Sequence, residues 1–348
     1  MGVLGTGENE AWIYMKGGTV PVAPIEKPKS IEWNRLLNEI SDATVDIPTG
    51  SHGDCCSIYG KLGTWGHELV IFRDGIRAWE GPLTNIRWRR GSVSLQAKDP
   101  LAWTLRTGSV ARLITTPAYV EAEGWWQFQQ AFTNSDPNVL ALAQRLATNT
   151  GPTVTRDIRA WAGYNSAAMS ELVKSGLMFT AVGRKVLLWH ADYLMGRTNT
   201  LLPDHISGEI EVEEDGLDLS VRSVMTNDDG VTGAFGTTPD SFYGDVQYLE
   251  SSDGVDAASL TAAATTHRAQ HYPAPVSVNV PQGSVLSCEA PFDMAELVAG
   301  AVVPVKVESG ICRPVLATQQ LQSVTVEDGP DGEKVSITVA PASSLVTS

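Results

Sequence analysis

The 348-residue sequence has only four cysteines, Cys55, Cys56, Cys288 and Cys312, and no C-x-x-C pair. Adjacent cysteines such as Cys55 and Cys56 cannot easily bridge each other, because a disulfide needs a wider separation of its two Cα atoms. Structural zinc sites and dithiol redox centres are usually built on closely spaced cysteine pairs. Neither is therefore expected, and the cysteines are predicted to be reduced, buried thiols.

Long apolar runs are also missing. The longest, residues 297–305, has about nine residues and contains Pro304, whereas a membrane-spanning helix needs about 20 residues. No basic segment precedes an apolar stretch near the start of the sequence, as a signal peptide would require. The sequence therefore predicts no direct membrane insertion and no secretion signal.

Basic residues are scarce. Lys and Arg number 25 against 40 Asp and Glu, which gives a formal net charge of −15. Nucleic acids and anionic membranes are bound by clustered Lys and Arg, so neither is expected as an adhesive partner. The acidic excess is also uneven, because residues 1–105 hold 11 basic and 12 acidic side chains whereas the remainder holds 14 and 28. The two ends of the chain are therefore expected to face different surroundings.

Motifs for catalysis or metal binding are absent from the sequence. It contains no G-x-S-x-G elbow, no H-E-x-x-H and no Walker loop, and its six histidines are scattered. The pairs His190/Asp192 and Asp204/His205 fall short of the three or four convergent ligands that a metal needs. We therefore expect a non-enzymatic protein without cofactor or metal. A hydrolase whose carboxylates meet only in space is a competing interpretation.

What the sequence does contain is a clear β pattern between residues 68 and 98. Glu68–Phe72 has the composition of a strand, and Asp74–Gly75 is a strong hairpin turn. An extended stretch then leads to a second turn at Arg90–Gly91, after which residues 93–97 alternate between apolar and polar. Three strands joined by tight turns form a meander, which is adequate as one wall of a barrel. Residues 11–15 and 43–47 are further strand candidates.

From about residue 106 the pattern changes to mixed helix and strand. Asp136 or Ser135 can cap a helix over 137–148, with Pro137 in its first turn. A second helix is predicted over 166–174, followed by a hairpin over 177–190 that turns at Gly183–Arg184. These elements predict a small α+β unit.

Four of the tryptophans invite a functional interpretation. Trp79 and Trp88 lie on extended segments of the meander and are predicted to pack in the core or against another subunit. A carbohydrate-binding aromatic platform is the alternative. Trp125 and Trp126 are adjacent, and neighbouring residues on a strand point to opposite faces. One of these two is therefore expected to contact a neighbouring subunit.

The acidic part of the chain begins near residue 209. Residues 209–225 are predicted to form a hairpin, and its acidic cluster comprises Glu211, Glu213, Glu214 and Asp215. This cluster lacks the D-x-D-x-D-G loop of a calcium site, so a solvated turn is the favoured interpretation. Beyond it we expect a strand at 242–249, a helix at 257–271, and strands again over 285–340.

Two segments together resemble a known family. The first is HELVIFRDGIRAWEGPLTNIRWRRGSVSLQAKDPLAW, residues 67–103, with IEWNRLLNEISDATVDIP, residues 31–48, upstream; the second is residues 300–341. They resemble the opening and closing parts of hub, or minor tail, proteins of long-tailed bacteriophages, particularly those of actinobacterial hosts. In that family an R-D-G hairpin leads into W-x-G-P. The matching positions, the structural motif expected in the first barrel, are Arg73, Asp74, Gly75, Trp79, Gly81 and Pro82.

The resemblance implies a mainly β fold with an α+β insertion. Each protomer would contribute two β-barrel domains like those of the tail tube, so that three protomers present six barrels to a sixfold tube. The implied domains are a first barrel at 1–105, a peripheral α+β domain at 106–205 with 233–275, and a second barrel at 206–232 with 276–348.

The implied function is that of a structural virion protein, a homotrimeric tail hub assembled in the host bacterial cytoplasm. It would close the distal end of the tail tube and form part of the DNA-ejection channel. Implied partners are the distal tail protein or tail-tube hexamer, the tape-measure protein, and other tail-tip or fibre proteins. The alternative is a carbohydrate- or receptor-binding protein of the tail tip.

A channel that passes DNA without holding it should be neutral or acidic, because carboxylates repel phosphates. This leads to the hypothesis that carboxylates of the second barrel, with Glu211, Glu213, Glu214 and Asp215 as candidates, face the channel. DNA passage would then be transient and independent of sequence.

Overall fold

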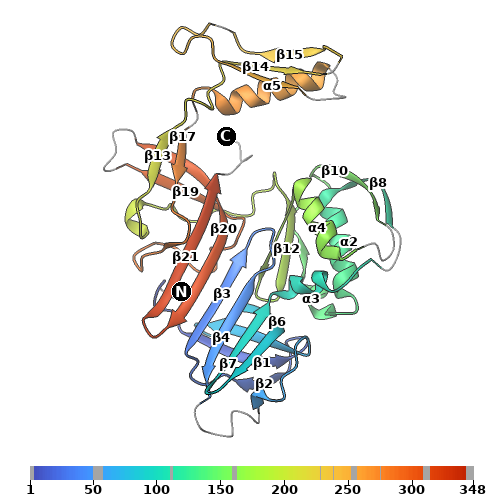
Figure 1. Cartoon of the computed structure of the whole chain (residues 1–348), viewed down its shortest axis with the longest axis vertical. Helices are drawn as coiled ribbons and strands as arrows, with labels where there is room; N and C mark the ends of the chain where they lie inside the picture. Colours follow the sequence, from blue (N-terminus) through green and yellow to red (C-terminus); the bar gives the residue numbers. More distant parts are fainter. Residues whose placement is uncertain are drawn as a thin grey trace. The chain divides into compact units, whose positions relative to one another are not determined.

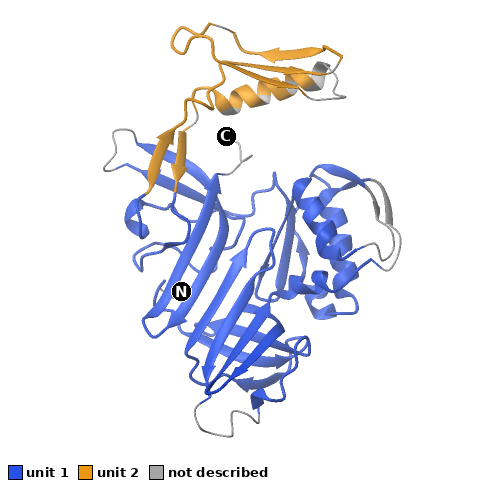
Figure 2. Cartoon of the chain, in the orientation of Figure 1, with its two compact units in different colours: residues 1–209, 280–348 blue, residues 210–279 orange. Residues whose placement is uncertain are grey.

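The computed structural model describes residues 4–49, 58–109, 113–158, 163–227, 229–237, 239–251, 257–274, 276–308 and 314–341. The chain divides into two compact units, which Figure 2 draws in different colours. Unit 1 comprises residues 1–209 and 280–348, and unit 2 comprises residues 210–279. No helix in the described ranges is long and apolar enough to cross a membrane.

Unit 1 is built on a large antiparallel sheet of 11 strands, to which both ends of the chain contribute (Figure 1). The strands are β1 (Asn9–Met15), β2 (Pro21–Pro24), β3 (Ser30–Leu36), β4 (Asp42–Pro48), β5 (His67–Arg73), β6 (Ile76–Arg89), β7 (Ser92–Lys98), β18 (Ser284–Val285), β19 (Val302–Val307), β20 (Val315–Gly329) and β21 (Gly332–Pro341). Their order is β18-β21-β20-β3-β4-β7-β6-β5-β1-β2, and β19 pairs with β20.

The pairing of β20 with β3 joins the two ends of the chain. Ser323 lies opposite Leu36, and Asp328 lies opposite Ile31. The mainly β fold is confirmed by this sheet, whose pairing runs without a break from the earliest strands to the last. Two closed barrels are not confirmed, because the described strands form an open path from β18 to β2 and no closed ring.

The predicted meander is confirmed as β5, β6 and β7. Arg73 pairs with Ile76, so Asp74 and Gly75 form a two-residue turn with φ values of 51° and 74°. Positive φ at both positions is the geometry that matches strand twist in a hairpin, and an Asp-Gly pair adopts it readily. Arg89 likewise pairs with Ser92 across the second turn.

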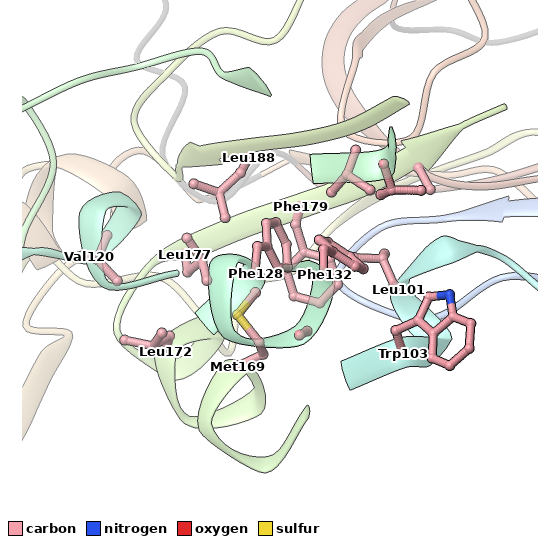
Figure 3. Close-up of a cluster of buried hydrophobic side chains, with 14 residues drawn as sticks. Leu101, Trp103, Val120, Phe128, Phe132, Met169, Leu172, Leu177, Phe179 and Leu188 are labelled. Carbon is pink, nitrogen blue, oxygen red and sulfur yellow. The ribbon is translucent and has the colours of Figure 1, made fainter. Parts of the chain in front are cut away.

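An α+β segment follows the meander within unit 1. Its elements are η1 (Pro100–Leu105), β8 (Leu113–Tyr119), α2 (Val120–Phe132), α3 (Pro137–Leu142), β9 (Gln144–Arg145), β10 (Thr153–Ile158), α4 (Asn165–Lys174), β11 (Leu177–Val182) and β12 (Lys185–His190). Helices α2 and α4 pack on the sheet β11-β12-β9, and their buried side chains meet between the layers (Figure 3). Phe128 and Phe132 of α2 lie beside Met169 of α4 and Phe179 of β11.

The sequence located part of this segment correctly. The helix predicted over 166–174 is α4, and the predicted hairpin is β11 and β12. Asp136 caps α3 through a hydrogen bond from the Val139 N–H. That helix ends at Leu142 and not at residue 148, because residues 144 and 145 pair with β12 as a short parallel strand.

Unit 2 is a small α+β layer. Its elements are β13 (Glu211–Glu214), β14 (Arg222–Thr226), β15 (Thr232–Phe235), β16 (Gln247–Ser251), α5 (Ala257–His271) and β17 (Val276–Asn279). α5, which was predicted, covers one face of the sheet β15-β14-β16, where Leu260 and Ala264 pack against Met225 and Tyr248. The predicted hairpin over 209–225 is wrong, because β13 pairs with β17 and β14 pairs with β15 and β16.

These pairings divide the chain differently from the predicted domains. Residues 206–232 were assigned to the second barrel and 233–275 to the peripheral domain. The structure instead places residues 210–279 in one unit, because β14 hydrogen-bonds to both β15 and β16 and packs against α5.

Candidate functional site

A buried ion pair joins the two ends of the chain. Arg73, at the end of β5, donates from Nε to Oε1 of Glu333 at 2.7 Å and from Nη2 to Oε2 at 2.8 Å. Both side chains are almost completely buried, and Glu333 lies at the start of β21. A bidentate guanidinium–carboxylate pair fixes both position and orientation. It therefore locks the N-terminal and C-terminal strands in one arrangement.

Glu333 is satisfied by further donors from the N-terminal segment. The backbone N–H groups of Gly5 and Gly7 donate to it at 3.1 and 3.0 Å, and Asn9 Nδ2 donates at 3.1 Å. Burial disfavours the carboxylate, but the hydrogen bonds from Arg73, Asn9 and Gly7 outweigh burial and lower the pKa of Glu333. The carboxylate therefore stays ionised in the folded protein.

Arg35 makes a second link between distant segments. It is buried on β3, where Nη1 donates to the carbonyl oxygens of Met294 and Leu297 and Nη2 donates to that of Ala78. Burial lowers the pKa of Arg35 to about 10. The side chain thus holds a C-terminal loop against β6 through backbone carbonyls.

The W-x-G-P residues of the motif, Trp79, Gly81 and Pro82, lie on β6. Trp79 is fully buried, and its backbone bridges to Gly183 of the β11–β12 turn. Pro82 is buried as well. A Cβ atom on Gly81 would overlap the carbonyl oxygen of Lys98, so β6 and the end of β7 approach too closely for any other residue.

Replacing Gly81 by alanine is therefore expected to lower the free energy of unfolding by at least about 1–3 kcal/mol, the usual cost of overpacking. Urea denaturation of the full chain measures this loss. Gly329→Ala is the control, since no atom lies within 4 Å of the position that its Cβ would take. Equal stability of the two variants would contradict the close-approach argument.

A second buried cluster holds the α+β segment on the large sheet. Arg184, in the β11–β12 turn, donates from Nη1 to Glu68 Oε2 at 3.0 Å and to Glu80, and from Nη2 to Asp136 Oδ2 at 2.7 Å. Arg77 donates to Glu80 Oε2 at 2.7 Å. Three carboxylates thus face two guanidinium groups, and with all five ionised the cluster has an excess of one negative charge.

Protonation of Glu68 removes this excess negative charge. Burial raises the pKa of Glu68 to about 8, although Arg184 and the N–H of Gly17 oppose the rise, and contact with Glu80 adds to it. A protonated carboxyl at Glu68 balances the cluster at neutral pH. Glu68, Glu80, Asp136 and Arg184 come from four separate elements, so the cluster had no sequence signature.

One face of the large sheet forms a continuous polar surface, which we call the polar face. It runs over β21, β20, β3, β4, β7 and the adjoining part of β6, and its opposite face is buried core. One row of directly opposed residues crosses all six strands. In order from β21 to β6 it is Lys334, Glu327, Glu32, Thr44, Gln96 and Asn85. The face comprises Asn85, Ser94, Gln96, Lys98, Asp42, Thr44, Asp46, Glu32, Asn34, Thr325, Glu327, Lys334 and Ser336.

The polar face is acidic at its centre. Glu32 and Glu327 lie directly opposite each other across β3 and β20, an arrangement that is unfavourable for like charges. Burial, together with the charges of Glu327, Asp42 and Asp46, raises the pKa of Glu32. The face is otherwise small hydroxyl and amide side chains, with two lysines among its charged groups.

The other predicted positions lie elsewhere. Trp125 and Trp126 are on helix α2, not on a strand, and both are partly buried; Trp125 packs against the core of Figure 3. Glu211, Glu213 and Glu214 are exposed on β13 of unit 2, and Asp215 follows them at intermediate exposure. Trp88 is 58% exposed, which contradicts a place in the core. Contacts of these residues with other subunits stay predictions.

Two further features could suggest enzymatic chemistry. A pocket of about 450 Å³ lies between η1, α2 and α4, and its lining mixes apolar side chains such as Phe128 and Met169 with polar ones such as Glu39, Lys98 and Ser166. In unit 2, Ser223 Oγ lies 2.9 Å from Nδ1 of His267, yet Ser223 is completely buried and so cannot meet a substrate. Across the described ranges, no group of three or more His, Cys, Asp or Glu side chains is arranged to hold a metal ion.

Similarity to known proteins was found in structure alone. No model of a known protein family matches the sequence, and no curated protein is similar to it. A tail protein from Neisseria meningitidis superposes with a TM-score of 0.58 at 12% identity, covering 95% of this chain and 96% of that one. The 43 kDa tail protein of a Shewanella oneidensis prophage gives 0.59 at 11% identity, with 96% and 98% covered.

A prophage tail protein from Listeria monocytogenes gives a TM-score of 0.57 at 9% identity, with 96% of this chain and 95% of that one covered. None of the three comes from an actinobacterial phage, so that finer likeness stays a prediction. Along nearly its whole length, the chain has the fold of phage tail proteins.

Proposed function

We propose that the chain is a structural, non-enzymatic protein of a phage tail, and that three copies form a hub at the distal end of the tail tube. The observation that carries this proposal is the fold shared with three tail proteins, which covers 95% of this chain for one of them and 96% for the other two. Both chain ends supply strands to one large sheet, and the two separate barrels with which three copies would match a sixfold tube stay a prediction.

The polar face is the surface we assign to the channel. It is broad and lacks aromatic side chains, and the residues named for it include four carboxylates and two lysines, while Arg87 of β6, which pairs with Ser94, adds a third cation at its edge. DNA phosphates would be repelled by its centre and would find few cations to hold them. Three such faces around an axis would form a bore through which DNA passes without stopping.

In this proposal the chain belongs to the virion, at the tail tip, and is assembled in the host cytoplasm. Its partners would be the distal tail protein or tail-tube hexamer on one side, and tape-measure, tip or fibre proteins on the other. The rigid link between Arg73 and Glu333 suits a part that transmits load between a tube and a tip.

The threefold state is tested by the mass of the purified full chain. Sedimentation velocity over a range of concentrations is expected to reveal a species of three chains, each of 37.3 kDa. Electron microscopy of tails labelled on this chain is expected to place it at the distal end. A label along the shaft, or a chain absent from purified tails, would contradict the hub.

The channel assignment is tested by reversing charge on the polar face. Virions carrying Glu32→Lys, Asp46→Lys and Glu327→Lys together are expected to assemble but to release their genome on the order of tenfold more slowly, because lysines bind phosphates. Release is followed by the fluorescence of a DNA-binding dye outside the particle.

Two matched triple variants serve as comparisons. Reversal at the exposed residues Glu26, Glu39 and Glu171 is expected to leave release unchanged. Reversal at Glu211, Glu213 and Glu214 separates the two candidate linings, since slow release in that variant alone would move the channel from the polar face to unit 2.

A further inference from the structure

The tip of the β6–β7 hairpin is strongly basic in an acidic protein. We call Arg87, Trp88, Arg89 and Arg90 the basic tip, and all four side chains are exposed. Among the described residues, none of these three arginines has a carboxylate partner within 4.0 Å. The tip lies at the β6 end of the polar face, where the charge changes sign.

Trp88 adds an exposed aromatic ring to the positive charge of the basic tip. Its indole is 58% exposed, and its only N–H group already donates to the Tyr59 carbonyl oxygen at 3.4 Å. The orientation of the ring is therefore fixed while its face stays open. Tryptophan and arginine are the residues that contribute most to the binding energy of protein interfaces.

Unit 2 has the complementary composition. Residues 210–279 contain 12 Asp and Glu, two Arg and no Lys. Phe242 is its most exposed aromatic side chain, at 85%, and it lies between Asp240 and Asp245 in the sequence. We call residues 240–245 the acidic loop. An exposed aromatic ring flanked by carboxylates matches an exposed aromatic ring flanked by arginines.

The acidic loop is ordered before any partner binds. Asp240 and Gly244 exchange backbone hydrogen bonds of 2.7 and 3.0 Å, and the Asp240 carboxylate accepts from the N–H groups of Phe242 and Tyr243. The hydroxyl of Tyr272 also donates to Asp240 at 2.9 Å. A loop held in this way loses little conformational entropy on binding.

We propose that the basic tip of one copy binds the acidic loop of unit 2 in a second copy. The inference rests on the self-association that the proposed hub requires, and it names the residues that make the contact. Trp88 of one copy packs against Phe242 of the other. The arginines of the basic tip pair with Asp245 and with other carboxylates of unit 2. Both surfaces are carried by the same chain, so contacts of this kind can close a ring.

The test is self-association of the full chain, measured by sedimentation velocity at several concentrations and salt levels. Trp88→Ala, Phe242→Ala, Arg89→Glu and Asp245→Arg are each expected to weaken association by about tenfold or more. Arg89→Glu combined with Asp245→Arg is expected to regain most of the loss, because the charges are exchanged. High salt is expected to weaken wild-type association.

Two exposed positions outside these surfaces are the controls. Lys29→Glu on unit 1 and Leu249→Ala on β16 of unit 2 are expected to leave association unchanged. If the four single variants associate as wild type does, the contact is refuted while the threefold hub stands. A monomeric wild-type chain would refute both the contact and the threefold state.

The same variants also test a second possible ligand of the basic tip. Arginines beside a tryptophan also bind nucleic acid. If Arg89→Glu abolishes binding of a short DNA duplex without altering the mass of the assembly, the basic tip is a phosphate-binding element and the contact between copies is refuted. Recovery of association in the charge-exchanged pair is the result that only a protein–protein contact predicts.

Discussion

Replacing Arg73 by methionine is expected to lower the free energy of unfolding by about 3–5 kcal/mol, the range found when one partner of a buried ion pair is removed. Methionine keeps most of the length of the side chain but leaves the Glu333 carboxylate without its cation. The side chain of Glu333 is only 1% exposed, so water cannot replace the guanidinium. Urea denaturation followed by tryptophan fluorescence measures the loss.

Two further variants complete the comparison. One carries Glu333→Met alone, and the other combines it with Arg73→Met. The two single losses are not expected to add, because the partners are in direct contact. The double variant should regain part of the stability, but not all, since Gly5, Gly7 and Asn9 would lose their acceptor. Hydrogen exchange should quicken in β5 and β21, the strands whose ends the pair fixes.

An exposed ion pair supplies the control. Lys174 and Glu171 on α4 lie 2.8 Å apart with side chains 72% and 54% exposed. Removing Glu171 with an alanine is expected to change the free energy of unfolding by less than about 1 kcal/mol. An Arg73→Met variant that lost no more than this control would show that the buried pair does not hold the ends of the chain together.

The local part of the fold was predictable from the sequence. Asp74, Gly75 and Gly91 are turn residues that suit positive φ, and the alternation of apolar and polar side chains in residues 93–97 marks the strand after the second turn. Asp136 before Pro137 marks the start of α3 by the same kind of local rule. Each of these signals is contained in fewer than about ten residues.

Helix α2 was missed, although it had a signal. Glu121 and Glu123 lie in its first turn, and Val120, Phe128 and Phe132 recur at helical spacing on its buried side. The adjacent pair Trp125–Trp126 drew attention to strand alternation and hid that spacing. Weighing the whole segment of 13 residues would have favoured a helix.

Long-range pairing was beyond the sequence. β13 finds its partner β17 more than 60 residues later, so nothing near residue 211 reveals that the expected hairpin does not form. Arg73 was identified only as part of a hairpin motif. Its contact with Glu333 spans 260 positions, and a pattern in one segment cannot show which distant carboxylate a buried guanidinium will meet.

The buried cluster around Arg184 predicts a pH dependence of the opposite sign from that of most acidic residues. A buried Glu68 with a pKa near 8 takes up a proton that the unfolded chain, with an ordinary glutamate pKa of about 4.3, does not hold. Between these values the folded state binds more protons. The free energy of unfolding should therefore fall as pH rises from 5 to 8, by at most about 1.4 kcal/mol per pH unit.

Glu68→Gln removes this dependence, because the amide resembles the protonated carboxyl at every pH. The stability of the variant should change less between pH 5 and 8 than that of wild type, and above pH 8 the variant should be the more stable. Urea denaturation at four pH values measures both slopes, with Glu171→Gln as the exposed control. Parallel slopes for Glu68→Gln and wild type would rule out a proton on Glu68.

The protonation state of Glu68 also affects how the α+β segment is held on the large sheet. Glu68 and Glu80 belong to the large sheet, whereas Arg184 and Asp136 belong to the α+β segment. Ionising Glu68 leaves three carboxylates to share two guanidinium groups in a largely buried site, which weakens the attachment of that segment. The pKa of Glu68, about 8, lies between pH 6.5 and pH 8.5. After correction for intrinsic rates, hydrogen exchange in β12 of the wild type should therefore be faster at pH 8.5 than at pH 6.5. In Glu68→Gln the corrected rates should be the same at both pH values. Glu333 cannot produce this effect, because its lowered pKa makes its contribution to stability disappear only as pH falls below the ordinary carboxyl range.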